Sequence, residues 1–159
     1  VETCKELEAR GADVVGMNCF RGPATMLPWL KEIRKAVSCH VAALPVPYRT
    51  TEQEPTFFNL SDHGPCRCPS PHGRTFPTAL DPLYCNRYEI GAFAKEAYGL
   101  GVHYLGVCCG ASPMLMREVA EAVGRTTEAS RYSEKMANHF LYGTNERIAD
   151  HIRALGDRA

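Results

Sequence analysis

Apolar residues follow two different spacings along the chain, and the two spacings alternate. In four segments they recur every three or four residues, which is typical of a helix with one buried face. Between these segments lie short continuous apolar runs, which are typical of strands buried on both faces of a parallel sheet. The periodic segments predict helices over residues 2–10, 23–37, 87–100 and 112–123. The apolar runs predict strands over residues 12–18, 39–44 and 103–107.

The order of these elements predicts an α/β fold. Helices and strands alternate from residue 2 to residue 123, as they do in βα units that build a parallel sheet. The chain has 159 residues, enough for one ordinary domain but too few for a complete eight-stranded α/β barrel of about 250 residues. It begins at Val1 within a helical pattern, so we expect it to be the C-terminal part of a longer protein.

Two segments depart from this pattern. Residues 45–85 hold eight of the eleven prolines and show no sustained periodicity. A connection of this length is typical of a functional or partly disordered segment. From residue 125 the chain becomes more polar, and one further helix is predicted over residues 145–155. We therefore expect a first domain over residues 1–124 and a C-terminal extension over residues 125–159.

The overall charge and the cysteine count narrow the class of protein. Eighteen basic and eighteen acidic residues cancel, so no long-range field favours nucleic acid or an anionic membrane. No apolar run approaches the roughly 20 residues that span a bilayer. The eight cysteines are compatible with a secreted disulfide framework or with reduced thiols inside the cell. Several of them end apolar strands, which favours reduced thiols and a cytoplasmic protein.

Cysteines at two strand ends form the strongest candidate site. Cys19 closes one predicted strand, and Cys108 and Cys109 follow another. The carboxyl ends of parallel strands carry the active site of an α/β barrel. One predicted strand lies between these two in sequence, so neighbouring pairing would separate their backbones by about 10 Å. Gly110 gives the chain freedom to turn, which lets the adjacent thiols face one point. Three thiolates suit zinc and leave one coordination position open, as in a catalytic site.

Other interpretations of the cysteines stay open at this point. A buried cysteine is usually a small apolar residue, and we expect this of Cys4, Cys39 and Cys85. Cys108 and Cys109 are adjacent, so a strained vicinal disulfide is an alternative to a shared metal ion.

Two further groups of residues deserve separate interpretations. A second set has residue types that suit zinc, but its spacing matches no standard zinc module and its surroundings are rich in proline. It consists of His63, Cys66, Cys68 and His72. We expect a mobile loop there rather than a metal site. Met26 and Trp29 are expected to pack on the sheet instead of binding a ligand.

Three segments of the chain resemble the zinc-dependent homocysteine S-methyltransferases. They are GADVVGMNC, AKEAYGLGVHYLGVCCGASP and the SEK of the C-terminal extension. The resemblance covers most of residues 1–145 and is weakest in the proline-rich segment, which is longer here than the family usually carries. Its most specific part is a strand-end cysteine followed about ninety residues later by a GxCCG motif.

The resemblance implies a fold and a set of metal ligands. It implies that residues 1–124 supply the last three strands of a (β/α)8 TIM barrel, with the long irregular loop at residues 45–85. It also implies that residues 125–159 serve subunit assembly, so the protein is expected to be a homo-oligomer. Carried over by position, it makes Cys19, Cys108 and Cys109 the ligands of one Zn²⁺ per chain. Asn18 matches the residue before the first ligand and is a candidate for supporting it. No further catalytic or cofactor-binding residue is carried over.

The function that this resemblance implies is methyl transfer to homocysteine. The segments EAYGLGVHYLG and LPVPYRT favour members that use betaine, which gives dimethylglycine and methionine. Alternatives are another donor such as S-methylmethionine, or a structural zinc-binding module without catalysis. Cationic donors bind against aromatic faces, and Tyr48, Phe57 and Phe58 lie in a loop that could reach the site. The expected partners are therefore small molecules, with neither nucleic acid nor membrane. The chain alone is expected to be inactive because it lacks most of the barrel.

Overall fold

The computed structural model describes residues 1–61, 73–144 and 146–158. The chain divides into two compact units, Val1–Thr127 and Glu128–Ala159. The first unit contains four α-helices and three strands among its described residues, and they alternate as the sequence predicts. The helices are α1 (Glu2–Ala9), α2 (Pro23–Ala36), α3 (Arg87–Gly99) and α4 (Pro113–Ala122). The strands are β1 (Val14–Asn18), β2 (His40–Leu44) and β3 (Tyr104–Leu105).

The three strands form a parallel sheet in the order β1-β2-β3. Val15 lies beside Val41, and Ala43 lies beside Leu105. The predicted α/β class with parallel βα units is confirmed, and an open sheet of this kind is compatible with part of a barrel. Strand β3 is shorter than predicted. Its pairing nevertheless continues beyond the regular strand, because the Gly106 N–H donates to the Ala43 carbonyl at 3.1 Å.

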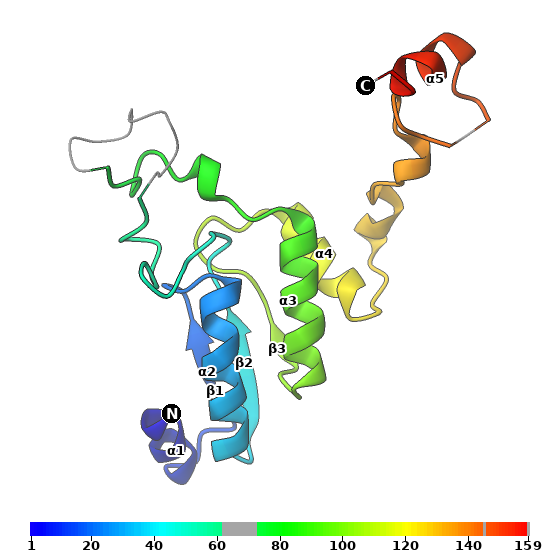
Figure 1. Cartoon of the computed structure of the whole chain (residues 1–159). Coiled ribbons are helices and arrows are strands. Elements are labelled where there is room, and N and C mark those ends of the chain that lie inside the picture. The colour runs from blue at the N-terminus through cyan, green and yellow to red at the C-terminus, as the bar shows by residue number, and fades with distance from the viewer. Residues whose placement is uncertain (62–72, 145, 159) are drawn as a thin grey trace. The chain divides into compact units, whose positions relative to one another are not determined.

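The main core lies between the sheet and the helices α2 and α3. Figure 1 shows α2 in front of β1 and β2, with α3 beside it. Met26, Leu30 and Ile33 form the face of α2 that meets the sheet, and each is almost fully buried. The prediction for Met26 is therefore confirmed. The prediction for Trp29 is wrong: its side chain is 46% exposed and lies under the Arg21 guanidinium, outside the stripe that faces the sheet.

The proline-rich segment between β2 and α3 is largely irregular, as predicted, yet its described part is well packed. It contains the short 3-10 helix η1 (Asp81–Leu83). Four of its apolar residues form a buried cluster of their own, which we call the loop cluster. These are Val46, Phe57, Leu60 and Leu80. Both the backbone N–H and the hydroxyl of Thr75 donate to the Leu60 carbonyl at 3.0 Å, which joins two distant points of the segment. The predicted second candidate set, His63, Cys66, Cys68 and His72, lies outside the described residues.

The second unit contains only short elements among its described residues. They are the 3-10 helices η2 (Glu128–Tyr132) and η3 (Met136–Asn138) and the helix α5 (Asp150–Gly156). The predicted start of a helix at residue 145 is wrong for residues 146–149, because Ala149 is extended and α5 begins only after it. Asn145 itself lies outside the described residues. Within the described parts of the chain, none of the helices combines the length and the apolar character needed to cross a bilayer.

Candidate metal centre

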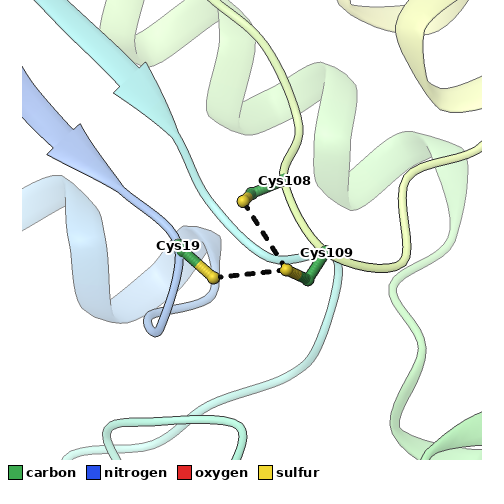
Figure 2. A group of neighbouring side chains, drawn as sticks. All are labelled: Cys19, Cys108 and Cys109. Atoms are coloured by element: carbon green, nitrogen blue, oxygen red, sulfur yellow. Dashed lines mark hydrogen bonds between the residues drawn. The ribbon is translucent and has the colours of Figure 1, made fainter.

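Three cysteine sulfurs meet at the carboxyl ends of the strands. Cys19 directly follows β1, while Cys108 and Cys109 lie on the segment that follows β3, and all three side chains point toward one another (Figure 2). The Sγ atom of Cys109 lies 3.5 Å from that of Cys19 and 3.8 Å from that of Cys108. All three sulfur atoms lie within 4.8 Å of one another. The predicted meeting of these residues, 90 positions apart in sequence, is therefore found in the structure.

The end of β2 and the residue that follows it set the spacing between Cys19 and Cys108. The Cys19 N–H donates to the Leu44 carbonyl at 2.9 Å, and the Cys108 N–H donates to the Pro45 carbonyl at 2.8 Å. Leu44 and Pro45 are consecutive in the chain, so their carbonyls continue the pairing of β2 toward β1 on one side and toward β3 on the other. The next residue, Val46, donates its own N–H to the Arg21 carbonyl at 3.0 Å. The distance between the two cysteines thus follows from the regular pairing of three parallel strands.

Sharp turns then aim the side chains at one point. Cys19 and Phe20 both have a left-handed backbone, with φ of +67° and +63°. This conformation costs a residue other than glycine about 1–2 kcal/mol. Gly110 takes the left-handed conformation on the other side of the site, with φ of +91°. Non-glycine residues held in this way concentrate at functional sites.

Hydrogen bonds and burial change the acidity of two of these thiols in opposite directions. Burial opposes ionisation of Cys19, but hydrogen bonds from the Phe20 N–H and the neighbouring thiols outweigh it, and the pKa of Cys19 falls below its ordinary value. Burial, together with the hydrogen bond to Cys19, raises the pKa of Cys108 to about 11. Without a metal ion, Cys19 is therefore the thiol of this pair that ionises first.

The arrangement of the sulfurs fits a zinc ion. Four ligands at about 2.3 Å from zinc in a tetrahedron would place two sulfurs about 3.8 Å apart, close to the separations of Cys109 from its two neighbours. No other histidine, cysteine or acidic residue joins this group within the described residues. Three protein ligands leave a fourth position for a substrate atom, as catalytic zinc sites do. The sulfur separations also exclude a vicinal disulfide between Cys108 and Cys109 in this structure.

The remaining cysteines of the described chain are free thiols away from this centre. Cys4 and Cys85 are buried among apolar side chains, as predicted. Burial and the nearby Glu89 carboxylate raise the pKa of Cys85 to about 12. Cys39 is only half-buried at the border of the main core, so the prediction of a buried thiol holds in part.

Aromatic rings from the irregular segment lie next to the centre. The loop cluster that contains Phe57 packs against Cys19 and Cys108. The ring of Tyr48 stacks on Phe57 with 5.8 Å between centroids. Phe58 is 36% exposed, and its ring lies 5.4 Å from that of Phe20. The prediction that this segment reaches the site is thereby supported. Asn18 ends β1 with an exposed side chain.

Two contacts of the segment between β2 and α3 were not predicted from the sequence, one at the cysteine group and one at the start of α3. The Tyr84 hydroxyl donates to the Gly110 carbonyl at 2.6 Å, and no local sequence pattern predicts this contact. Arg49 makes a two-bond ion pair with Glu89, with both nitrogen–oxygen distances at 2.7 Å. Glu89 also forms a capping box with Asn86 at the start of α3. The sequence NRYE at residues 86–89 has the spacing of a capping box, so this feature was open to detection.

Known proteins are similar in sequence to this chain over most of its length. A family model described as Homocysteine S-methyltransferase matches residues 1–123. The chain is 33% identical over 147 residues to betaine–homocysteine S-methyltransferase 1 of Danio rerio, which covers 90% of this chain and 34% of that protein. It is 33% identical over 126 residues to the protein of the same name from Xenopus tropicalis, which covers 76% of this chain and 28% of that protein.

A relative with a different methyl donor in its name matches the same part of the chain. The S-methylmethionine–homocysteine S-methyltransferase of Mus musculus is 29% identical over 126 residues, which covers 76% of this chain and 31% of that protein. The chain thus spans about a third of the length of the curated relatives it matches.

Proposed function

Because the chain belongs to the homocysteine S-methyltransferase family, we propose that it forms the zinc-binding part of an enzyme that transfers a methyl group from betaine to homocysteine. The observation that carries this proposal is the meeting of Cys19, Cys108 and Cys109 within 4.8 Å at the strand ends. We assign these three residues as the ligands of one Zn²⁺. The products would be dimethylglycine and methionine.

The chemistry needs an ionised sulfur on homocysteine, because the thiolate is the nucleophile and a free thiol is mostly protonated near neutral pH. A zinc ion bound by three thiolates supplies Lewis acidity that favours the ionised form of a fourth sulfur ligand. In the overall reaction a sulfur–carbon bond forms and a nitrogen–carbon bond breaks. The donor nitrogen keeps the electron pair and leaves as a neutral amine.

The described residues contribute positions, charge and exclusion of water. Leu44 and Pro45 hold the backbones of Cys19 and Cys108 at a fixed separation, so the ligands need little rearrangement to bind an ion. Hydrogen bonds lower the pKa of Cys19, whereas burial raises that of Cys108, so an ion that binds both as thiolates has to displace the Cys108 proton. The loop cluster packs apolar side chains against Cys19 and Cys108, which limits the access of water from that side.

The choice of betaine as donor rests on similarity. The betaine–homocysteine S-methyltransferases 1 of Danio rerio and Xenopus tropicalis are each 33% identical to this chain, against 29% for the relative named for S-methylmethionine. Betaine carries a quaternary ammonium, and aromatic faces attract such cations. Phe20 and Phe58 are exposed rings beside the centre and are suited to contribute to that surface.

The remaining parts of the proposal concern the complete protein. We propose that the three-stranded sheet is completed to a (β/α)8 TIM barrel by further residues of a longer chain. We also propose that residues 125–159 take part in a homo-oligomeric interface, that the protein is cytoplasmic, and that residues 1–159 alone are inactive. A structural zinc module is the competing function. Such a site needs four protein ligands, and the described residues bring only three together.

The test is methionine formation by the complete protein, with homocysteine and either betaine or S-methylmethionine. We expect turnover with betaine, one bound zinc per chain, and loss of both in Cys109→Ala. The matched control is Cys39→Ala, which removes a thiol outside the centre and should keep zinc and activity. Turnover with S-methylmethionine alone would keep the zinc assignment and change the donor. Full zinc content and full rate in Cys109→Ala would refute the assignment of the ligands.

A further inference from the structure

The turn that carries Cys109 is fastened by a residue outside the cysteine group. The Tyr84 hydroxyl donates to the Gly110 carbonyl at 2.6 Å, immediately after the cysteine pair. Gly110 is left-handed, and the Ala111 N–H closes the turn by donating to the Cys108 carbonyl at 2.8 Å. A glycine turn has more backbone freedom than any other. The bond from Tyr84 therefore restrains the part of the site that would otherwise move most easily.

Tyr84 is itself restrained by backbone pairing and a ring contact. Its backbone forms an antiparallel bridge with Tyr48, and the edge of one ring meets the face of the other with centroids 5.6 Å apart. The neighbouring Cys85 N–H donates to the Pro47 carbonyl at 2.9 Å, and the Arg49 N–H donates to the Leu83 carbonyl at 2.9 Å. Residues 47–49, which contact Tyr84 and its neighbours, thus directly follow Leu44 and Pro45, which fix the distance between Cys19 and Cys108.

Cys109 is the member of the group for which this restraint matters most. Its sulfur lies 3.5 Å from that of Cys19 and 3.8 Å from that of Cys108. Cys109 is also the exposed member of the three, so little packing holds its side chain in place. A shift of the Gly110 turn would therefore move this sulfur away from its present position beside the other two.

We propose that Tyr84 is a positioning residue for metal binding, acting through its hydrogen bond to Gly110 to hold Cys109 where it can share an ion with Cys19 and Cys108. This inference rests on the proposed zinc site and adds a residue to it. Tyr84 acts through the backbone and is no metal ligand. Ligands that already lie in the right positions reduce the free-energy cost of binding an ion. Loss of the hydrogen bond from Tyr84 should therefore weaken metal binding.

The experiment compares the zinc affinity of the complete, metal-stripped protein with that of Tyr84→Phe, by competition with a chromophoric chelator. Loss of one neutral hydrogen bond predicts zinc binding about fivefold weaker. The control is Tyr88→Phe, which removes the hydroxyl of an exposed tyrosine on α3 that accepts a hydrogen bond from the Arg87 side chain. We expect wild-type affinity in that control. Thermal unfolding of the metal-free proteins is measured in parallel.

A third variant, Tyr84→Leu, separates positioning from packing, since Tyr84 also packs against the cluster around Cys85 and Ile90. If the hydroxyl positions the turn, the Phe and Leu variants weaken zinc binding to a similar extent, although the Leu variant is less stable. If Tyr84 only packs, the Phe variant binds zinc like wild type, and the inference is overturned. A wild-type protein that binds no zinc would instead overturn the metal site itself and this role with it.

Discussion

The substitution Gly110→Ala measures how tightly the turn beside the candidate metal centre is packed. Gly110 has φ of +91°, and a Cβ atom there would lie 2.6 Å from the Tyr48 hydroxyl oxygen. The left-handed conformation alone costs a non-glycine residue about 1–2 kcal/mol. Overpacking against the Tyr48 ring adds about 1–3 kcal/mol. This ring cannot yield freely, because it is stacked on Phe57 and touches Tyr84. We expect the free energy of unfolding to fall by about 2–5 kcal/mol.

A second glycine provides the control that isolates the contact. Gly11 has nearly the same backbone, with φ of +95°, but a Cβ atom there would meet nothing within 4 Å. Gly11→Ala should therefore cost only the backbone part, about 1–2 kcal/mol. Urea unfolding of the metal-free proteins measures both losses of unfolding free energy, provided that the slope of free energy against urea concentration is the same for all variants. In a Tyr48→Ala background, Gly110→Ala should lose its additional cost and behave like Gly11→Ala. Equal losses for the two single glycine variants would refute this reasoning.

Three further predictions test the packing and the charges. Met26→Ala should lower the free energy of unfolding by about 2–5 kcal/mol and Trp29→Ala by under about 1 kcal/mol, because of these two residues only Met26 is fully buried. Similar losses of unfolding free energy, measured by urea unfolding, would contradict the assignment of the core face of α2. Hydrogen bonds from Arg49 hold the pKa of Glu89 below its usual range, so the pair stabilises the fold above pH 4.5 and this gain disappears as the pH falls through the lowered pKa. Glu89→Gln should therefore lower the melting temperature at pH 7, and this difference from wild type should shrink as the pH falls below 4.5; a difference that does not change with pH would rule out the ion pair as the cause. Burial raises the pKa of Cys85 to about 12, so iodoacetamide should modify it at pH 8 only after unfolding, and peptide mass mapping would reveal an early reaction that contradicts this.

The elements with a strong local pattern could be predicted from the sequence. Helix α3 has a continuous apolar stripe, and it occupies nearly the predicted residues. The end of strand β1 could be placed because an apolar run stops there, whereas β3 ends at Leu105, two residues before the predicted end. The two apolar runs nevertheless brought Cys19 to the same sheet edge as Cys108 and Cys109. The rule that parallel strands carry their sites at one edge then supplied the long-range contact without any knowledge of the loops.

Features that depend on contacts between distant segments could not be predicted. The left-handed backbone at Cys19 and Phe20 has no signal, since neither residue is a glycine or an asparagine. Its cost is offset by tertiary bonds such as the one from the Cys19 N–H to Leu44. Trp29 was misjudged because its apolar character says nothing about its angle on the helix, which the burial of Met26 and Leu30 reveals.

The hydrogen bonds between Thr75 and Leu60 bear on how related chains can differ in length. Both residues are almost fully buried, so the two ends of the stretch between them are held together inside the packed part of the segment. The entropy of closing a loop grows slowly, by about 0.6 kcal/mol for each doubling of its length. Insertions between these two residues should therefore accumulate in evolution at little cost. The spacing of Cys19 and Cys108 depends on Leu44 and Pro45 instead, so the candidate metal centre and the length of the chain between Leu60 and Thr75 can change independently in evolution.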